Sequence, residues 1–308
     1  MNVIVTTTIN PPTKALKLFA QMPDWTLIVV GDLKTPGHLY TQELPNAIYV
    51  SPAEQEARCK PLSDAIGWNC IQRRNFGFLW AKDMGAKIVG IVDDDNIPLD
   101  LKWGSSLLLC QRTEVNYYQE DGPVFDPVGC TNYPHLWHRG FPLQLLAFRK
   151  YQKPTTKLIV PEVQADFWDG DPDIDAVCRM QFRPDCIFDA RCFPIASSKI
   201  SPFNSQNTFM NAELLSEYFL FPGIGRMDDI WASYYLQLKT GAKVVYNKPS
   251  VFQDRNEHNL IEDMKNEYIG YERTLALIEA MIKNPESINN FIPARAQEAF
   301  RLYRSCFE

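Results

Sequence analysis

Three consecutive carboxylates stand directly after an apolar run in this sequence. Residues 86–92 read AKIVGIV, which is typical of a buried strand, and Asp93, Asp94 and Asp95 follow at once. A solvated turn is one interpretation, because Asp side chains often cap turns after strands. Three adjacent negative charges repel one another, and a divalent cation is the usual compensator because hard ions take oxygen ligands. The residues alone leave the turn and the metal site open as alternatives.

A second acidic pair, Asp228 and Asp229, stands at the predicted start of a helix, in the segment RMDDIW. Acids at a helix N-terminus complement the helix dipole, so capping is the alternative interpretation. If both acidic clusters face one pocket, one can hold a metal ion while the other positions or deprotonates a hydroxyl group. Whether the clusters meet depends on the tertiary structure.

Three further polar segments could contact a charged or polar ligand. Arg73 and Arg74 lie on a predicted helix before the acidic strand; the fork of an Arg suits a diphosphate, and a solvated helix face is the alternative. The loop WDGDPDIDA, residues 168–176, carries four acids. It lacks the remaining ligands of a calcium loop, so we predict that it binds a polar acceptor. The segment QDRNEH, residues 253–258, is predicted to close over a phosphate or a metal ion.

Composition excludes several classes of protein. The chain has 308 residues, 45% hydrophobic and 22% charged, which is ordinary for a globular protein. Its formal net charge of -6 argues against general nucleic-acid binding. The eight Cys form no C-x-x-C pair, so reduced thiols in a cytosolic protein are expected. No segment approaches the roughly 20 apolar residues of a membrane span, and the N-terminus does not resemble a signal peptide. We therefore expect a cytoplasmic protein without a membrane span.

The elements that must position the acids read as alternating strands and helices. The elements expected in the first part of the chain are strands at 2–9, 25–32, 47–51 and 86–92 and helices at 14–22 and 69–85. Such alternation predicts a mostly parallel sheet with helices on its faces, and ligands bind such sheets beyond the carboxyl ends of the strands. Asn10, Asp32 and the acidic run 93–95 all fall at such ends.

The rest of the chain divides into long loops and a helical C-terminus. Residues 100–200 are rich in Pro and aromatic side chains, and we predict long, shaped loops there. The elements expected beyond them are helices at 211–221, 227–241, 257–283 and 293–306 and a strand at 242–247. We expect one domain over 1–256 and a C-terminal helical extension, 257–308, packed on it.

Seven motifs occur along the chain in a fixed order: VTTTINPPT, WTLIVVGDLKTP, RRNFGFLWAKDMGAKIVGIVDDDNIP, HRGFPL, DIDAV, RMDDIWASYYLQ and VFQDRNEHNLIED. The ordered set resembles STELLO-type glycosyltransferases and, more distantly, the plant reversibly glycosylated polypeptides, which include UDP-arabinopyranose mutases. The resemblance implies an α/β fold of GT-A type, a nucleotide-sugar donor and a metal-binding D-x-D motif on residues 93–95. STELLO proteins are anchored in a membrane, so the chain resembles their catalytic module alone.

The resemblance also implies roles for single residues. The expected donor-binding residues are Thr8, Asn10, Asp32, Arg74, Asp93 and Asp94, and the expected metal ligands are Asp93, Asp95, Gln253 and His258. Either Gln253 or His258 is expected to complete the metal shell. Leu146 stands where the mutase-like relatives carry a reversibly glycosylated Arg, which argues against a mutase.

We therefore predict a metal-dependent hexosyl- or pentosyltransferase with Mn²⁺ or Mg²⁺ as cofactor. It is expected to move a sugar from a nucleotide sugar, in the first instance a UDP-sugar, to a hydroxyl group of a glycan, a lipid-linked molecule or a protein. Asp229 is predicted to be the general base and Asp228 to orient the acceptor. Trp231, Asp175 and Asn207 are predicted to contact the acceptor. A nucleotide-sugar mutase and a non-catalytic protein that binds a sugar nucleotide or glycan are the alternatives.

Overall fold

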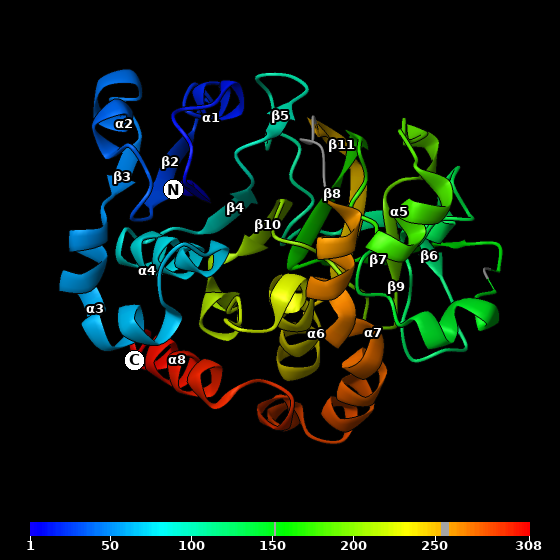
Figure 1. Ribbon diagram of the computed structural model, residues 1–308. Helices are drawn as coiled ribbons and strands as arrows, with labels where there is room; N and C mark the ends of the chain where they lie inside the picture. Colours follow the sequence, from blue (N-terminus) through cyan, green and yellow to red (C-terminus); the bar gives the residue numbers. More distant parts are fainter. Residues whose placement is uncertain (151, 254–258) are drawn as a thin grey trace.

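The structure is a computed structural model that describes residues 1–150, 152–253 and 259–308. One eleven-stranded sheet runs through these residues (Figure 1). Its strand order is β3-β2-β1-β4-β10-β8-β11-β9-β6-β7, and β5 pairs with β11. The strands are β1 (Asn2–Thr8), β2 (Trp25–Gly31), β3 (Ile48–Val50), β4 (Ile88–Val92), β5 (Asn96–Pro98), β6 (Thr113–Tyr118), β7 (Thr155–Ile159), β8 (Val163–Gly170), β9 (Ile195–Ser197), β10 (Asn207–Asn211) and β11 (Val244–Gln253).

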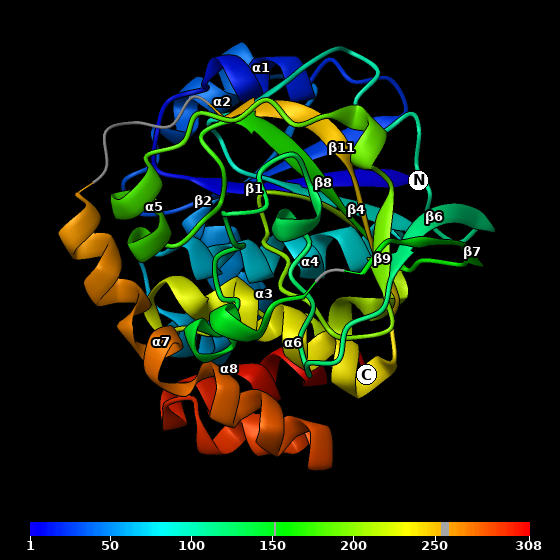
Figure 2. The same ribbon diagram turned by 90° about the vertical axis from the view of Figure 1, so that its right-hand side faces the viewer.

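Helices cover both faces of the sheet. The α-helices are α1 (Lys14–Phe19), α2 (Gly37–Glu43), α3 (Pro52–Ile66), α4 (Arg74–Asp83), α5 (Ala176–Phe182), α6 (Asp228–Thr240), α7 (Leu260–Lys283) and α8 (Ala294–Ser305). The short 3₁₀ helices are η1 (Ile71–Arg73), η2 (Val128–Cys130), η3 (Leu143–Phe148), η4 (Ala190–Cys192), η5 (Ala212–Glu217), η6 (Gly225–Met227) and η7 (Pro285–Asn290). Figure 2 shows α4, α6, α7 and α8 on one side of the sheet and α1 on the other.

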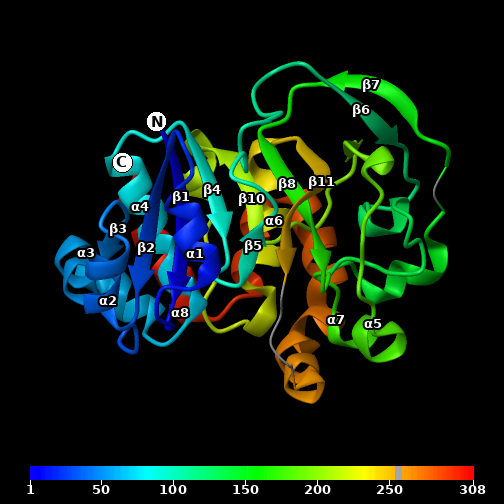
Figure 3. The same ribbon diagram turned by 90° about the horizontal axis from the view of Figure 1, so that it is seen from above.

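Several strands end at the same edge of the sheet. β1 pairs in parallel with β2 and β4, and β8 pairs in parallel with β11. β10 lies antiparallel between β4 and β8, so β4 and β8 point the same way (Figure 3). The prediction of an α/β fold, with a mixed sheet between helices and further helices at the C-terminus, is confirmed. The carboxyl ends of β1, β2, β4, β8 and β11 therefore form a common edge.

The first part of the chain folds as its local patterns predict. Thr13 caps α1, because its hydroxyl accepts a hydrogen bond from the Leu16 backbone N–H at 3.2 Å. α4 packs on β1 and β2, and Gly77 makes this close approach possible because a Cβ there would clash with Val5 and Val30. The packing fixes the start of α4 beside the carboxyl end of β4.

The prediction of a helix over 211–221 is wrong. Residue 211 ends β10, residues 212–217 form η5, and the following residues 218–221 are buried and belong to no helix or strand. The Asn75 side chain pairs with the Leu220 backbone through two hydrogen bonds of 3.0 Å. These tertiary contacts satisfy backbone groups that a helix would have satisfied internally, so they override the helix propensity of the segment.

The two C-terminal helices pack on the rest of the molecule. α7 contacts α5 and α6, and α8 contacts α3. The expected domain boundary after residue 256 falls outside the described residues. Among the described helices, none combines the length and the apolar character that crossing a lipid bilayer requires.

Candidate functional site

The two acidic clusters line one cavity at the carboxyl edge of the sheet. This cavity, termed here the acidic cavity, has a volume of about 250 Å³. Asp93 and Asp95 reach it from the end of β4, and Asp228 and Asp229 from the start of α6. Its lining residues are Ile71, Asp93, Asp95, Arg139, Ser205, Gln206, Gly225, Arg226, Asp228, Asp229 and Gln253.

A second cavity adjoins the first and is termed here the amino-terminal cavity. Its volume is about 240 Å³, and Ile71 lines both cavities. Asp93 and Asp95 face the acidic cavity, whereas Asp94 between them faces the amino-terminal cavity. The lining residues of the amino-terminal cavity are Thr7, Thr8, Ile9, Asn10, Asp32, Asn69, Cys70, Ile71 and Asp94. The structure therefore brings Thr8, Asn10, Asp32 and Asp94 together, as the donor-site prediction requires.

Asp94 ties the end of β4 to the end of β1. Its carboxylate accepts hydrogen bonds from the hydroxyl of Thr8 and from Asn10 Nδ2, the latter at 2.9 Å. Its backbone carbonyl accepts a hydrogen bond from the Thr13 hydroxyl at 2.5 Å. The acidic run is consequently held in a defined position and is not a freely solvated turn.

Asp32 stabilises one wall of the amino-terminal cavity. Its carboxylate accepts backbone hydrogen bonds from Leu33 at 2.6 Å, Asn69 at 2.9 Å and Cys70 at 3.1 Å. The side chain is almost fully buried. Asp32 thus holds the loop after α3 against the end of β2, which gives this cavity a fixed wall.

Arg74 lies behind Asp93 and outside both sets of cavity-lining residues. Its Nη2 atom pairs with Asp93 Oδ1 at 2.5 Å, and its Nη1 atom donates to the Ser205 carbonyl and hydroxyl at 2.7 and 2.8 Å. Burial raises the pKa of Asp93, whereas Arg74 opposes that shift. The predicted direct contact of Arg74 with the donor is corrected: because the guanidinium is buried and engaged, Arg74 positions Asp93.

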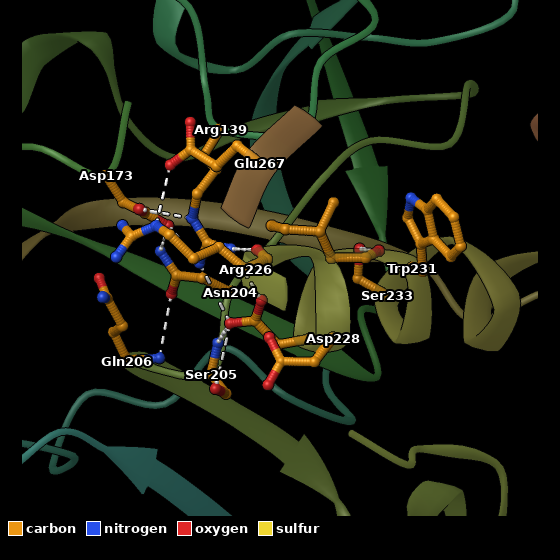
Figure 4. Close-up of polar contacts among 12 residues, drawn as sticks. Arg139, Asp173, Asn204, Ser205, Gln206, Arg226, Asp228, Trp231, Ser233 and Glu267 are labelled. Carbon is orange, nitrogen blue, oxygen red and sulfur yellow. Dashed lines mark hydrogen bonds and ion pairs between the residues drawn. The ribbon is translucent and has the colours of Figure 1, made fainter. Parts of the chain in front are cut away.

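Arg139 joins Asp229 to Asp173 in a buried ion-pair network. Figure 4 shows Arg139 beside Asp173. The guanidinium donates to Asp173 at 2.8 and 3.0 Å and to Asp229 at 3.0 and 3.3 Å. The Ser205 backbone N–H and hydroxyl add hydrogen bonds to Asp229 at 2.9 and 3.1 Å. Both carboxylate oxygens of Asp229 are therefore occupied by donors from the protein.

Asp228 has a different environment from its neighbour. It accepts a hydrogen bond from Gln72 Nε2 at 2.7 Å. Burial raises the pKa of Asp228 to about 7, the negative charge of Asp229 adds to this rise, and Arg139 opposes it. A carboxyl group with a pKa near neutrality is suited to exchanging a proton with a ligand in the cavity.

The C-terminal helix α7 supports the opposite wall of the acidic cavity. Glu267 Oε1 pairs with Arg226 Nε at 2.9 Å, and Glu267 Oε2 accepts the Ala176 backbone N–H at 2.7 Å. Gly225, at φ +60°, lies against the backbone of Asn266, where a Cβ would clash. The loop before α6 is therefore seated on α7.

Oxygen atoms in the acidic cavity fit a hard divalent cation. Gln206 Oε1 and Gln253 Oε1 are buried and accept no hydrogen bond from the described residues. Together with the carboxylates of Asp93 and Asp95, they line one cavity. Within the described ranges, no group of three or more His, Cys, Asp and Glu side chains is arranged as a metal site. Mg²⁺-like ions need only one or two carboxylates when substrate phosphates and water complete the shell. His258 lies outside the described residues.

The three predicted acceptor-binding residues do not line the acidic cavity. Trp231 is fully buried, donates to Thr274 Oγ1 at 3.0 Å and points away from the Arg139 network (Figure 4). Asp175 caps α5 and accepts the Trp137 indole N–H at 2.6 Å. Asn207 lies inside the sheet and accepts the Trp103 indole N–H at 3.0 Å. We correct these assignments, because each side chain is already engaged in the interior.

Several residues of the site were not identified from the sequence. They are Gln72, Arg139, Ser205, Gln206 and Glu267. Asp173 and Arg226 lie in segments singled out in the sequence, but no role was predicted for either residue by itself. The motif HRGFPL contains Arg139, and the motif DIDAV contains Asp173. The sequence therefore indicated both segments, but it did not predict the ion pair between these two residues. Glu267 lies in an ordinary amphipathic helix, and its sequence context carries no signal.

Comparison with known proteins shows relatives in plants. No protein family model matches the chain. The chain is 24% identical to the probable glycosyltransferase STELLO2 of Arabidopsis thaliana, over 91% of this chain and 39% of that protein. It is 22% identical to the probable glycosyltransferase STELLO1 of the same plant, over 96% of this chain and 42% of that protein. The chain thus spans about two fifths of the length of these relatives.

Solved structures with a similar arrangement were also found. Glucosyl-3-phosphoglycerate synthase from Mycobacterium tuberculosis, in complex with Mn²⁺ and UDP-glucose, aligns with a TM-score of 0.47 and 13% identity, over 92% of this chain and 78% of that chain. A mannosyltransferase from Pyrobaculum calidifontis, in complex with GDP-mannose and Mn²⁺, aligns with a TM-score of 0.45 and 11% identity, over 99% of this chain and 73% of that chain. By sequence, the chain is similar over nearly its whole length to the STELLO-type glycosyltransferases, which confirms the resemblance predicted from its motifs.

Proposed function

We propose that this chain is a metal-dependent glycosyltransferase of GT-A type that uses a nucleotide-sugar donor, in the first instance a UDP-sugar. One observation carries the proposal: two adjoining cavities at the carboxyl edge of the sheet are joined by the run 93–95. A nucleoside fits the amino-terminal cavity, and the diphosphate then lies along the acidic run. The transferred sugar lies in the acidic cavity beside Asp228. The similarity to two probable glycosyltransferases supports the same activity.

Asp93, Asp95 and Gln253 are the residues proposed to hold Mn²⁺ or Mg²⁺. When bound, the ion neutralises the donor diphosphate and stabilises the nucleoside diphosphate as the leaving group. Arg74 keeps the Asp93 carboxylate in place through the 2.5 Å ion pair. Gln206 supplies a further oxygen on the same wall.

The donor-binding role is proposed for the same four residues as before, Thr8, Asn10, Asp32 and Asp94. Three of them contact the donor directly, and Asp32 supports the cavity wall. Thr8, Asn10 and Asp94 form a hydrogen-bonded group at the mouth between β1 and β4. Asp32 acts through the wall that it fastens, because its carboxylate is occupied by backbone N–H groups. The exposed Ile9 offers an apolar surface for the base.

Asp228, and not Asp229, is proposed as the general base. Asp229 would have to give up its ion pair with Arg139 before accepting a proton, whereas Asp228 has a pKa of about 7. In an inverting transfer, the acceptor oxygen bonds to the anomeric carbon while the bond from that carbon to the phosphate oxygen breaks. The hydroxyl proton passes to the Asp228 carboxylate. Asp229 then acts as the fixed anchor of Arg139.

Calorimetry and a donor-hydrolysis assay test this function. UDP and GDP are titrated into the protein with and without Mn²⁺, and release of UDP from UDP-glucose is then followed without an acceptor. We expect metal-dependent UDP binding and slow, metal-dependent UDP release. Binding without release would favour the non-catalytic alternative, and conversion of the sugar without release of UDP would favour the mutase. Absence of nucleotide binding would refute the proposal.

A further inference from the structure

One short run of residues takes part in both cavities of the candidate site. The backbone N–H groups of Asn69 and Cys70 donate to the Asp32 carboxylate at 2.9 and 3.1 Å, in the wall of the amino-terminal cavity. The next residue, Ile71, lines the amino-terminal cavity and the acidic cavity. The run 69–71 therefore belongs to both.

Gln72, which follows this run, contacts the proposed general base. Its Nε2 atom donates a hydrogen bond to Asp228 Oδ2 at 2.7 Å. Within the described ranges, it is the one side chain that donates a hydrogen bond to this carboxylate. Gln72 is buried in η1, and Asp228 begins α6, 156 residues later in the chain. The direction of the Asp228 side chain is thus set from outside its own helix.

Arg73 fixes the backbone that carries Gln72. Its guanidinium donates to Gln55 Oε1 at 2.7 Å and to Ser63 Oγ at 3.1 Å, and both partners lie in α3. The same guanidinium lies 3.6 Å from the ring centroid of Trp68, which is the geometry of a cation–π contact. Arg73 is fully buried, so these contacts hold η1 against α3.

Two further residues continue this anchoring at the start of α4. Arg74 pairs with Asp93 at 2.5 Å, and Asn75 makes two hydrogen bonds of 3.0 Å with the Leu220 backbone. Both side chains are fully buried. Gln72 therefore stands on a segment that is bonded to the protein interior on either side. Such a support holds a reacting group within the narrow range of geometries that catalysis requires.

An uncharged donor suits a carboxylate that has to exchange a proton. A cation such as Arg139, which pairs with Asp229 at 3.0 Å, strongly favours the charged form of its partner. The Gln72 amide has no net charge, so it directs Asp228 with a smaller effect on the pKa. Burial raises the pKa of Asp228 to about 7, and the Gln72 hydrogen bond opposes this rise. One contact can thus orient the carboxylate and leave it able to take up a proton.

We propose that Gln72 is the positioning residue of the general base. This inference rests on the function proposed above, in which Asp228 receives the proton of the acceptor hydroxyl. The Gln72 amide holds the Asp228 carboxylate in one orientation, so the carboxylate is already directed when an acceptor enters the acidic cavity. Without this hydrogen bond the side chain distributes among several rotamers, and fewer encounters are productive.

Other charged groups also act on Asp228 and stay in place when Gln72 is replaced. The charge of Asp229 adds to the rise in the pKa of Asp228, and Arg139 opposes it. The other titratable groups around Asp228 are Asp93 and Asp95 at the end of β4, Arg226 in η6 and the buried Tyr218 after η5. Because none of them is altered, a change in the pKa of Asp228 reports the lost hydrogen bond.

Gln72→Met tests the inference, because Met has a similar length and donates no hydrogen bond. We expect kcat to fall by about ten- to a hundredfold, with the KM for the donor nearly unchanged. The acidic limb of the kcat/KM profile should move to higher pH by about one unit, because a hydrogen bond to the ionised carboxylate is lost.

Gln237→Met is the matched control. This buried glutamine lies near the end of α6, outside the acidic cavity, and donates to the Ser201 carbonyl at 2.7 Å. Its replacement should lower the free energy of unfolding and leave kcat and the pH profile as in the wild type. A merely structural role of Gln72 would produce the same result in Gln72→Met.

A titration that needs no substrate separates this inference from the proposed function. The Asp228 carboxyl carbon is followed by NMR of isotope-labelled protein, with Asp228→Asn for assignment. Its midpoint should rise by about one pH unit in Gln72→Met and stay unchanged in Gln237→Met. An unchanged midpoint, or a wild-type kcat, in Gln72→Met overturns the role of Gln72. Absence of turnover in the wild type would count against the proposed function instead.

Discussion

Arg139 holds Asp229 through two buried hydrogen bonds, of 3.0 and 3.3 Å, while the adjacent Asp228 contacts Gln72 instead. Two neighbouring carboxylates of the same type thus have opposite environments. One is neutralised by a cation, and the pKa of the other rises to about 7. Pairs of acids whose environments differ in this way commonly divide structural and proton-transfer roles between them.

Asp228→Asn should greatly lower turnover while leaving donor binding intact. Loss of a general base typically lowers the rate by about 10²- to 10⁴-fold. Steady-state rates with a nucleotide-sugar donor, together with calorimetry of UDP binding, check the result. Asp64→Asn, on the exposed surface of α3, is the control and should keep the wild-type rate. Wild-type turnover in Asp228→Asn would remove this residue from the mechanism.

The same base predicts an acidic limb in the pH–rate profile. Asp228 accepts a proton only when ionised, so kcat/KM should rise with pH and reach half its plateau near the raised pKa of about 7. The profile of the wild-type protein between about pH 5 and 9 measures this limb. A rate that is constant down to pH 5 would contradict the assignment.

Asp229→Asn should act mainly on stability. The substitution removes the charge that compensates Arg139, and disrupting a buried ion pair costs about 3–5 kcal/mol. Urea unfolding should show this loss in the free energy of unfolding. Asp83→Asn removes one partner of the partly exposed pair with Arg58 and should cost less than about 1 kcal/mol. Equal losses of unfolding free energy in the two variants would mean that the buried Arg139 network stabilises the protein no more than the partly exposed Arg58–Asp83 pair does.

Asp95→Asn should weaken UDP binding only when Mn²⁺ is present. The substitution removes one of two carboxylates proposed to bind the ion, so we expect at least a tenfold loss of metal-dependent affinity, about 1.4 kcal/mol. Calorimetry with and without Mn²⁺ measures the difference. Asp100→Asn, at an exposed position shortly after β5, should bind like the wild type. If Asp95→Asn kept full affinity with Mn²⁺, the metal assignment would fail.

Asp175 should make the protein less stable as the pH rises. Burial raises the pKa of Asp175 to about 7, whereas the hydrogen bonds from Cys178 and Trp137 oppose the rise. The ordinary value is 3.8, so the native state binds more protons than the unfolded state between about pH 4 and 7. The free energy of unfolding therefore falls across this window, by up to about 4 kcal/mol from this group.

Urea unfolding of the wild type and of Asp175→Asn at about pH 4.5 and about pH 7.5, near the two ends of this window, measures the change in the free energy of unfolding. Asn also caps helices well, so the start of α5 should persist. The variant should lose less stability than the wild type between the two pH values. Asp185→Asn, an exposed substitution, should follow the wild type. An unchanged pH dependence in Asp175→Asn would show that Asp175 is ionised in the native protein.

Local patterns in the sequence determined much of the fold and part of the site. The apolar run before Asp93 ends a strand as predicted, because the extended apolar segment is buried in the sheet and the three acids that follow it lie at the sheet edge. Asp32 and Asn10 likewise follow strands of the parallel sheet. Parallel strands end at one edge, so the residues after them converge without any further information.

Tertiary structure alone decided which of these residues line a cavity. Arg74, Trp231 and Asn207 have residue types suited to a binding site, yet each is buried and bonded inside the protein. Burial depends on what packs against an element, and a single segment does not contain that information. The helix predicted over 211–221 failed for the same reason, since contacts with Asn75 replaced local propensity.

The difference between Asp228 and Asp229 shows where sequence information ends. Both residues have the same side chain and the same helix start, so their local sequence offers no means of telling them apart. Arg139 arrives from a loop far earlier in the chain, and Gln72 from the segment before α4. Electrostatic interactions depend on distance and burial in three dimensions, so the separation of the two acids exists only in the folded protein.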